Sequence, residues 1–153
     1  MRSVLGRGAL ALLIAAVAPQ TAGPAVAASA LEKGQVVIDG RVNIAVEVAR
    51  GPQAQAKGLA GRRSLKHGTG MIFPYDVPGN RAFWMRGMLI PLDILWIRAG
   101  KIVAIETNLP PPSPKTEPVI YSHSADLVLE VSAGYAQEME IQVGQSVKVN
   151  YKK

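Results

Sequence analysis

The stretch QVVIDGRVNIAVEV, residues 35–48, decides the fold class of this chain. In residues 42–48, apolar side chains alternate with Asn43, Ala45 and Glu47, which is the period of a strand with one buried face. The dipeptide Asp39-Gly40 separates two such runs, and it is a strong signal for a two-residue turn. The stretch therefore predicts an antiparallel hairpin.

The sequence beyond this hairpin continues as short apolar runs broken by glycine and proline. Further strands are expected at 71–73, 81–85, 92–97, 101–106, 126–131 and 147–151. Pro74 is expected to end the first of these. Short helices are expected at 52–57 and 133–139, and a proline-rich surface loop at 108–118. The pattern predicts a mostly β (α+β) fold, a small barrel-like or sandwich domain of short antiparallel strands.

The N-terminal segment has the pattern of a cleaved signal peptide. Arg2 and Arg7 supply a positively charged region at the start of the chain. Residues 9–18 are apolar, and small residues at 25–30 offer A-x-A cleavage sites. A spanning helix needs about 20 apolar residues, so an uncleaved anchor is the less favoured alternative. We expect a signal peptide at 1–28, cleaved between residues 27 and 30, and one domain at 29–153 that is periplasmic or secreted, with no membrane span after cleavage.

Composition narrows the classes of function. The chain has 153 residues, with 17 basic and 11 acidic side chains and no cysteine. The absence of cysteine excludes thiol catalysis, disulfides and iron–sulfur clusters. The basic residues are scattered and form no stripe interleaved with aromatics, so nucleic acid is not expected as a partner. No cofactor is expected, and we expect a monomer.

Residues 83–93, FWMRGMLIPLD, are the first candidate for a functional surface. Strand alternation puts Phe83 and Met85 on one face and Trp84 with Arg86 on the other. We expect the first pair in the core and the second pair at a surface or pocket. Aromatic rings beside arginine and Asp93 suit a sugar ring or a peptide, through stacking and bidentate hydrogen bonds.

The favoured hypothesis is a non-catalytic periplasmic binding or accessory domain. Its ligand would be an envelope saccharide, a small anion or a periplasmic protein. The candidate ligand-binding residues are Trp84, Arg86, Asp93 and Arg81, with Arg62 and Asn108 as weaker candidates.

Two alternatives stay open. One is a hydrolase in which Asp93 and Glu130 act as paired carboxylates; their structural alternatives are hydrogen bonding to backbone amides for Asp93 and an outward-facing position for Glu130. The other is a periplasmic copper protein. Its soft ligands would be Met71, Met85 and Met88, together with His67 or His123, unless the methionines fill gaps in the core.

Several short motifs carry a resemblance to one family. They are Gly58-Leu59 with Arg62 and Ser64-Leu65, GMIF at 70–73, FWM at 83–85, IPLD at 90–93, Pro118-Val119, LEV at 129–131, Ala133-Gly134 and Val143-Gly144. From Gly58 to about Tyr151 the chain resembles the bacterial and archaeal family called domain of unknown function 192. The family usually has Asn-Thr in place of Gly87-Met88 and Gly-Asp in place of Gly144-Gln145. The resemblance implies a compact, mostly β domain that is often exported, with no established activity.

Overall fold

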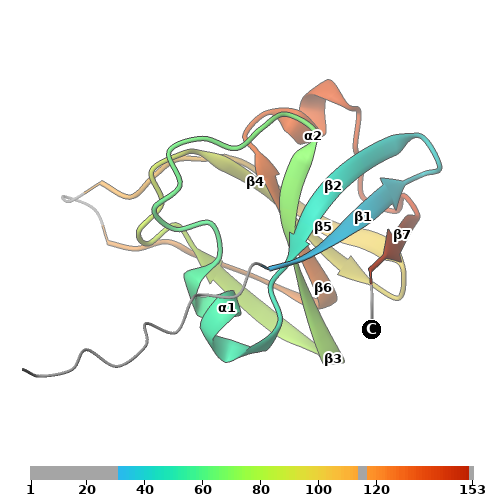
Figure 1. Ribbon diagram of the computed structural model, residues 1–153, viewed down its shortest axis with the longest axis horizontal. Coiled ribbons are helices and arrows are strands. Elements are labelled where there is room, and N and C mark those ends of the chain that lie inside the picture. The colour runs from blue at the N-terminus through green and yellow to red at the C-terminus, as the bar shows by residue number, and fades with distance from the viewer. Residues whose placement is uncertain (1–30, 114–116, 152–153) are drawn as a thin grey trace, which may run out of the picture.

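The computed structural model describes residues 31–113 and 117–151, which form one curled sheet with two short helices (Figure 1). The strands are β1 (Glu32–Ile38), β2 (Val42–Val48), β3 (Thr69–Trp84), β4 (Leu92–Arg98), β5 (Lys101–Leu109), β6 (Ile120–Ser132) and β7 (Val147–Asn150). The helices are α1 (Gly51–Lys57) and α2 (Tyr135–Glu138). The sheet has seven strands in the order β5-β4-β6-β3-β2-β1-β7. The expected mostly β class is confirmed.

The first hairpin forms as the sequence predicts. β1 and β2 pair antiparallel from Glu32 opposite Val48 to Ile38 opposite Val42. Asp39 and Gly40 have φ angles of 52° and 71°, both in the left-handed region that a two-residue hairpin turn requires. The apolar residues of β2 are buried, and its polar positions are more exposed.

The two edge strands of the sheet, β5 and β7, meet near their first residues. The amide of Val147 donates to the carbonyl of Gly100 at 2.8 Å, and the amide of Ile102 donates to Gln145 at 3.0 Å. A bridge between Lys101 and Ser146 lies between these bonds. The curled sheet is therefore pinned into a barrel-like shape, and part of its edge strands is covered.

The expectation that Pro74 ends a short strand is wrong. β3 runs through both Pro74 and Pro78, and its register against β6 shifts between Pro74 and Gly79. A bulge at this shift accommodates the prolines, which have no amide N–H to donate to the ladder. The expected strands at 71–73 and 81–85 are therefore parts of one strand.

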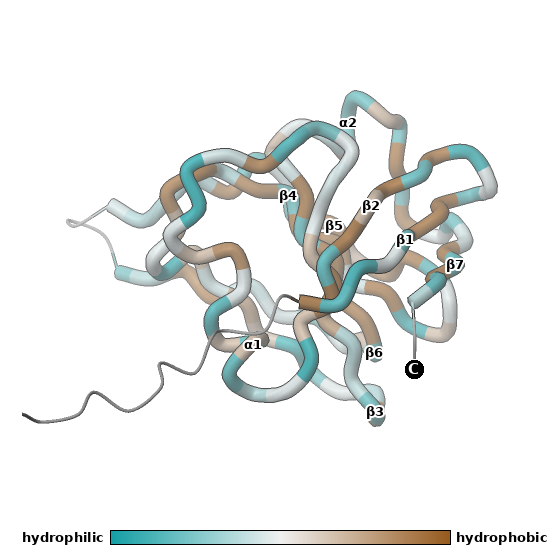
Figure 2. The backbone as a smooth tube through the Cα atoms, in the orientation of Figure 1, coloured by the Kyte–Doolittle hydropathy of each residue, from teal (hydrophilic) through white to brown (hydrophobic). Residues whose placement is uncertain are grey.

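The sheet is buried on both faces in its middle. Figure 2 shows that the strands there are largely hydrophobic. Along β4, Leu95 and Ile97 pack in one hydrophobic cluster, and Ile94 and Trp96 pack in a second. The first cluster includes β1, β2 and α2, and the second includes Leu59, which follows α1. Strands covered on both faces lose the simple alternation of apolar and polar residues.

The expected signal peptide at 1–28 lies outside the described residues. In the part of the chain that the structure describes, no helix is long and apolar enough to span a membrane.

Candidate functional site

Glu130 is a buried carboxyl group in the middle of the sheet. It lies opposite Met71 of β3 and Ile94 of β4, and it is only 6 % exposed. Its Oε2 atom is fully buried and has no hydrogen-bond partner. Burial raises the pKa of Glu130 to about 8, although the nearby Arg62 guanidinium acts in the opposite direction. The alternative that Glu130 faces outward is wrong, because β6 is covered on both faces.

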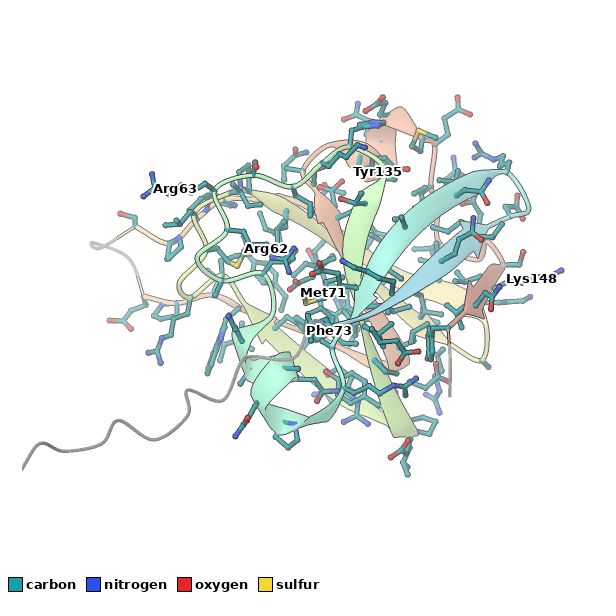
Figure 3. The ribbon with its side chains drawn as sticks, viewed as in Figure 1. Arg62, Arg63, Met71, Phe73, Tyr135 and Lys148 are labelled. Carbon is teal, nitrogen blue, oxygen red and sulfur yellow. The ribbon has the colours of Figure 1, made fainter. Side chains whose placement is uncertain are left out.

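A cavity of about 240 Å³ lies beside this carboxyl group. It is formed by the end of α1 and the residues after it, by the first and last parts of β3, and by the segment that follows β3. Its lining residues are Gln55, Ala56, Lys57, Gly58, Leu59, Ala60, Phe73, Tyr75, Ala82, Phe83, Trp84, Arg86, Met88 and Glu130. Figure 3 shows Phe73, Met71 and Arg62 near the centre of the molecule, around this part of the sheet. We call this space the Glu130 cavity.

Gly58 allows the end of α1 to approach the cavity closely. Its amide donates to the carbonyl of Ala54 at 2.9 Å and ends the helix. Its φ angle is 48°, and an added Cβ would lie 3.4 Å from Cζ of Phe73 and 3.8 Å from Oε2 of Glu130. A glycine suits this position because it tolerates a positive φ and leaves the space beside Glu130 open.

Trp84 and Arg86 form the outer part of the cavity. Trp84 is 51 % exposed, and the Arg86 guanidinium lies 5.2 Å from the centre of its ring. Phe83 points inward and makes an edge contact with Phe73 at 5.0 Å, and Met85 is buried. The expected division of residues 83–86 into an inner and an outer pair is confirmed.

Arg86 also borders a second, larger hollow of about 450 Å³. Its other lining residues include Pro110, Pro111, Pro112, Val119 and Tyr121. Ile120 lies opposite Trp84 in the ladder between β3 and β6, and it is 61 % exposed. The proline-rich loop is therefore one wall of a hollow that adjoins the Trp84–Arg86 surface.

Residues 34–149 match the family model of domain of unknown function 192 (DUF192), described as an uncharacterized ACR. The chain belongs to this family. Its fold resembles a candidate transcription regulator from Sinorhizobium meliloti, with 28% identity, a TM-score of 0.72, and coverage of 78% of this chain and 95% of that one. It also resembles a protein of unknown function from Novosphingobium aromaticivorans, with 33% identity, a TM-score of 0.69, and coverage of 84% and 94%. No curated protein matches the sequence.

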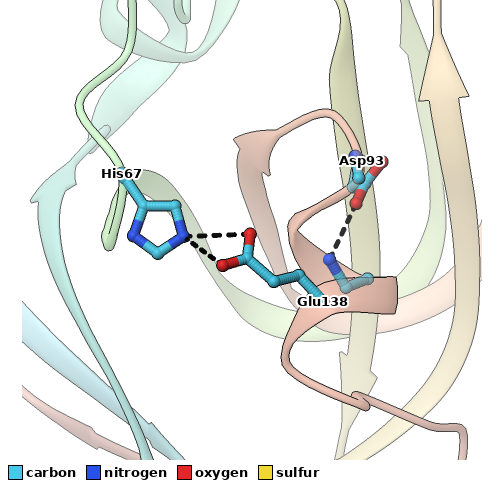
Figure 4. Close-up of polar contacts among 5 residues, drawn as sticks. His67, Asp93 and Glu138 are labelled. Carbon is cyan, nitrogen blue, oxygen red and sulfur yellow. Dashed lines mark hydrogen bonds and ion pairs between the residues drawn. The ribbon is translucent and has the colours of Figure 1, made fainter.

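Asp93 of the DUF192 domain lies in the interior of the fold and does not line the Glu130 cavity. It is fully buried, and it accepts hydrogen bonds from the amides of Asn108 at 2.8 Å, Gly134 at 3.0 Å and Ala136 at 2.9 Å. Figure 4 shows the bond to the start of α2. This is the structural alternative that the sequence offered for Asp93.

The paired-carboxylate hypothesis fails for a geometric reason. Asp93 lies opposite Val131, and Glu130 lies opposite Ile94 in the same ladder. Neighbouring positions along paired strands point to opposite faces, so the two carboxyl groups lie on different sides of the sheet. They cannot act together on one substrate.

Arg81 and the two weaker candidates, Arg62 and Asn108, have roles in the fold. Arg81 stacks on Tyr75 at 3.9 Å and donates to the carbonyl of Val77, which holds the bulge of β3. Arg62 forms an ion pair with Glu47, and it also acts electrostatically on Glu130. Asn108 has a φ of 54°, and its backbone amide bonds to Asp93.

The methionines and histidines of the copper hypothesis are engaged elsewhere. Met71, Met85 and Met88 are at most 6 % exposed and belong to the second hydrophobic cluster. Nε2 of His67 lies 3.1 Å from Glu138 (Figure 4), and Nε2 of His123 lies 2.9 Å from Glu106. This arrangement favours the alternative in which the methionines fill the core.

Sequence reasoning missed Gly58 as part of the cavity. Gly58 lies in one of the motifs that carry the family resemblance, so that motif was the available signal.

Proposed function

We propose that this protein is an exported, non-catalytic binding domain whose ligand occupies the Glu130 cavity. The observation that carries the proposal is the Oε2 atom of Glu130, which is buried without a hydrogen-bond partner beside an open cavity. A buried polar atom without a partner is costly, and a bound ligand would remove that cost by supplying one.

The outer part of the cavity supports the same interpretation. Trp84 offers a half-exposed indole for stacking, and Arg86 offers a guanidinium that can bind oxygen atoms in pairs. Trp84 is the last residue of β3 and Arg86 follows it, and both are exposed.

Binding is favoured over catalysis by the composition of the lining. Glu130 is the single carboxyl group among the described residues that line the cavity. Burial raises the pKa of Tyr75, so this phenol stays neutral near pH 7 and is a poor proton acceptor. A hydrolytic mechanism with paired carboxylates would need a second carboxyl group beside Glu130.

The predicted signal peptide supports a periplasmic or secreted location. In that compartment the ligand would be an envelope saccharide, a small anion or part of a periplasmic protein. The mild excess of basic residues suits a partner that carries negative charge.

Native mass spectrometry of protein expressed with its own N-terminal segment and purified from the periplasm tests the proposal. We expect a mass that reports cleavage between residues 27 and 30 and an adduct that is lost in Trp84→Ala and in Arg86→Ala. The melting temperature of both variants should stay close to that of the original protein. Arg63→Ala is a matched control, because Arg63 is exposed and outside the cavity.

Two results would contradict this function. A large fall in the melting temperature of Trp84→Ala or Arg86→Ala would show that these residues are structural. An adduct with the mass of copper would instead favour the methionine site.

A further inference from the structure

We propose that the ligand of the Glu130 cavity is an acidic sugar unit. In this arrangement its ring stacks on Trp84, a ring or hydroxyl oxygen accepts a hydrogen bond from Glu130, and its anionic group binds Arg86 and Lys57. The inference rests on the proposed function above and adds the chemical class of the ligand.

The charges around the cavity favour an anion. Lys57 and Arg86 both line it, and neither forms an ion pair with a carboxylate of the described residues. Arg62 lies close enough to Glu130 to affect it electrostatically. Since the pKa of Glu130 is raised by burial, this residue is largely protonated near neutral pH and does not cancel these cations. The local field therefore attracts a negatively charged ligand.

The carboxyl group suits an oxygen-rich ligand. A protonated Glu130 can donate a hydrogen bond from Oε2, which has no partner within the protein. An amine would require Glu130 to be ionised, and it would meet repulsion from Lys57 and Arg86. Hydroxyl, ring or carbonyl oxygens therefore fit the buried end of the cavity better than nitrogen cations do.

The size and the aromatic wall favour a single ring. The cavity of about 240 Å³ lies just below the roughly 300–1,000 Å³ that is usual for pockets holding drug-sized ligands. About half of the Trp84 surface remains open, and Tyr75 and Phe83 extend the apolar wall inward. The Arg86 guanidinium next to the indole can bind a carboxylate or a phosphate through two oxygens.

A titration that monitors tryptophan fluorescence tests the inference on the mature protein. The probes are glucose, glucosamine, glucuronate and glucose 1-phosphate. Trp96 is fully buried, so a change on binding reports mainly on the half-exposed Trp84. We expect glucuronate or glucose 1-phosphate to bind at least about tenfold more tightly than glucose, as one charge-assisted hydrogen bond would give. The preferred probe identifies the anionic group as a carboxylate or a phosphate.

Variants separate the contributions of charge and shape. Arg86→Gln and Lys57→Gln should each reduce the preference for the acidic sugar over glucose, and Arg63→Gln should leave it unchanged. Glu130→Gln keeps a hydrogen-bond donor and should keep binding at pH 7. Between pH 7 and pH 9 the original protein should lose affinity as Glu130 ionises beside the anion, and the Gln variant should not.

Equal affinity for glucose and glucuronate would overturn the acidic-sugar inference and leave the proposed binding function intact. Tighter binding of glucosamine would overturn it as well, because an ionised Glu130 would then be the attractive group. If no sugar binds at millimolar concentration, the inference fails, and an adduct of another kind in the mass spectrum would still support the broader function.

Discussion

The replacement Glu130→Gln should remove a strong dependence of stability on pH. The pKa of Glu130 is raised from 4.5 to about 8 in the folded domain, mainly by burial. The folded state therefore holds this proton more tightly than the unfolded chain does. The resulting stability is fully present below pH 4.5 and is lost as the pH rises towards 8. Glutamine has a similar shape and cannot ionise, so the variant should lack this loss.

The size of the effect follows from the pKa difference. At about 1.4 kcal/mol for each pKa unit, the difference between 4.5 and about 8 corresponds to roughly 5 kcal/mol above pH 8. This is an upper bound, because water entering the cavity would relieve part of the cost of the buried charge. It is still a large share of the roughly 5–15 kcal/mol by which a small domain is stable.

Urea unfolding followed by circular dichroism at pH 5 and at pH 9 measures the effect. We expect Glu130→Gln and the original protein to have similar free energies of unfolding at pH 5. At pH 9 the variant should be more stable by several kcal/mol. Glu117→Gln is the matched control, because Glu117 is exposed and should change neither value. Both variants keep the pairs of His67 and His123, so the difference between them isolates Glu130.

Two outcomes would refute this reasoning. The first is an original protein that is as stable at pH 9 as at pH 5. The second is a Glu130→Gln variant that is less stable than the original protein at pH 9. Either result would mean that Glu130 is ionised in the folded domain and that the Arg62 guanidinium outweighs the effect of burial.

Three further predictions use the same unfolding assay. Asp93→Asn should lower the free energy of unfolding by about 3 kcal/mol. The carboxylate accepts hydrogen bonds from three backbone amides, and asparagine puts an NH2 donor in place of one of its oxygens. A loss no greater than that of the exposed-site control Asp76→Asn would contradict the anchoring role of Asp93. Gly58→Ala should cost about 1–2 kcal/mol. Gly61→Ala shares the positive φ but meets open space, so equal losses in the two variants would show that the contact with Phe73 and Glu130 is unimportant. Arg62→Gln should move the fall in stability to higher pH, because its guanidinium lowers the pKa of Glu130, and an unchanged midpoint would exclude that influence.

The features that the sequence predicted correctly are local ones. The turn at Asp39-Gly40 has two left-handed residues, as a two-residue hairpin turn requires. The helix at 52–57 begins beside Pro52 and ends at Gly58. The inner and outer pairs within residues 83–86 followed from strand alternation alone. In each case the deciding interactions lie within a few residues of one another.

The site depended on interactions between distant segments. Glu130 between Leu129 and Val131 was compatible with an exposed or a buried side chain, and only the packing of α1 and β3 on that face buried it. Asp93 binds amides that lie 15 to 43 residues away in the chain. β3 continued through Pro74 because its register against β6 shifts there, so that a proline without an amide lies at an irregularity of the ladder.

The sequence by itself therefore determined the β class, the hairpin turns and the outward side of Trp84 and Arg86, because these follow from backbone preference and a period of two. Only the tertiary structure decided which carboxyl group anchors the fold and which one faces a cavity. The physical reason is that burial and hydrogen-bond supply at Asp93 and Glu130 are set by chain segments that are distant from them in the sequence.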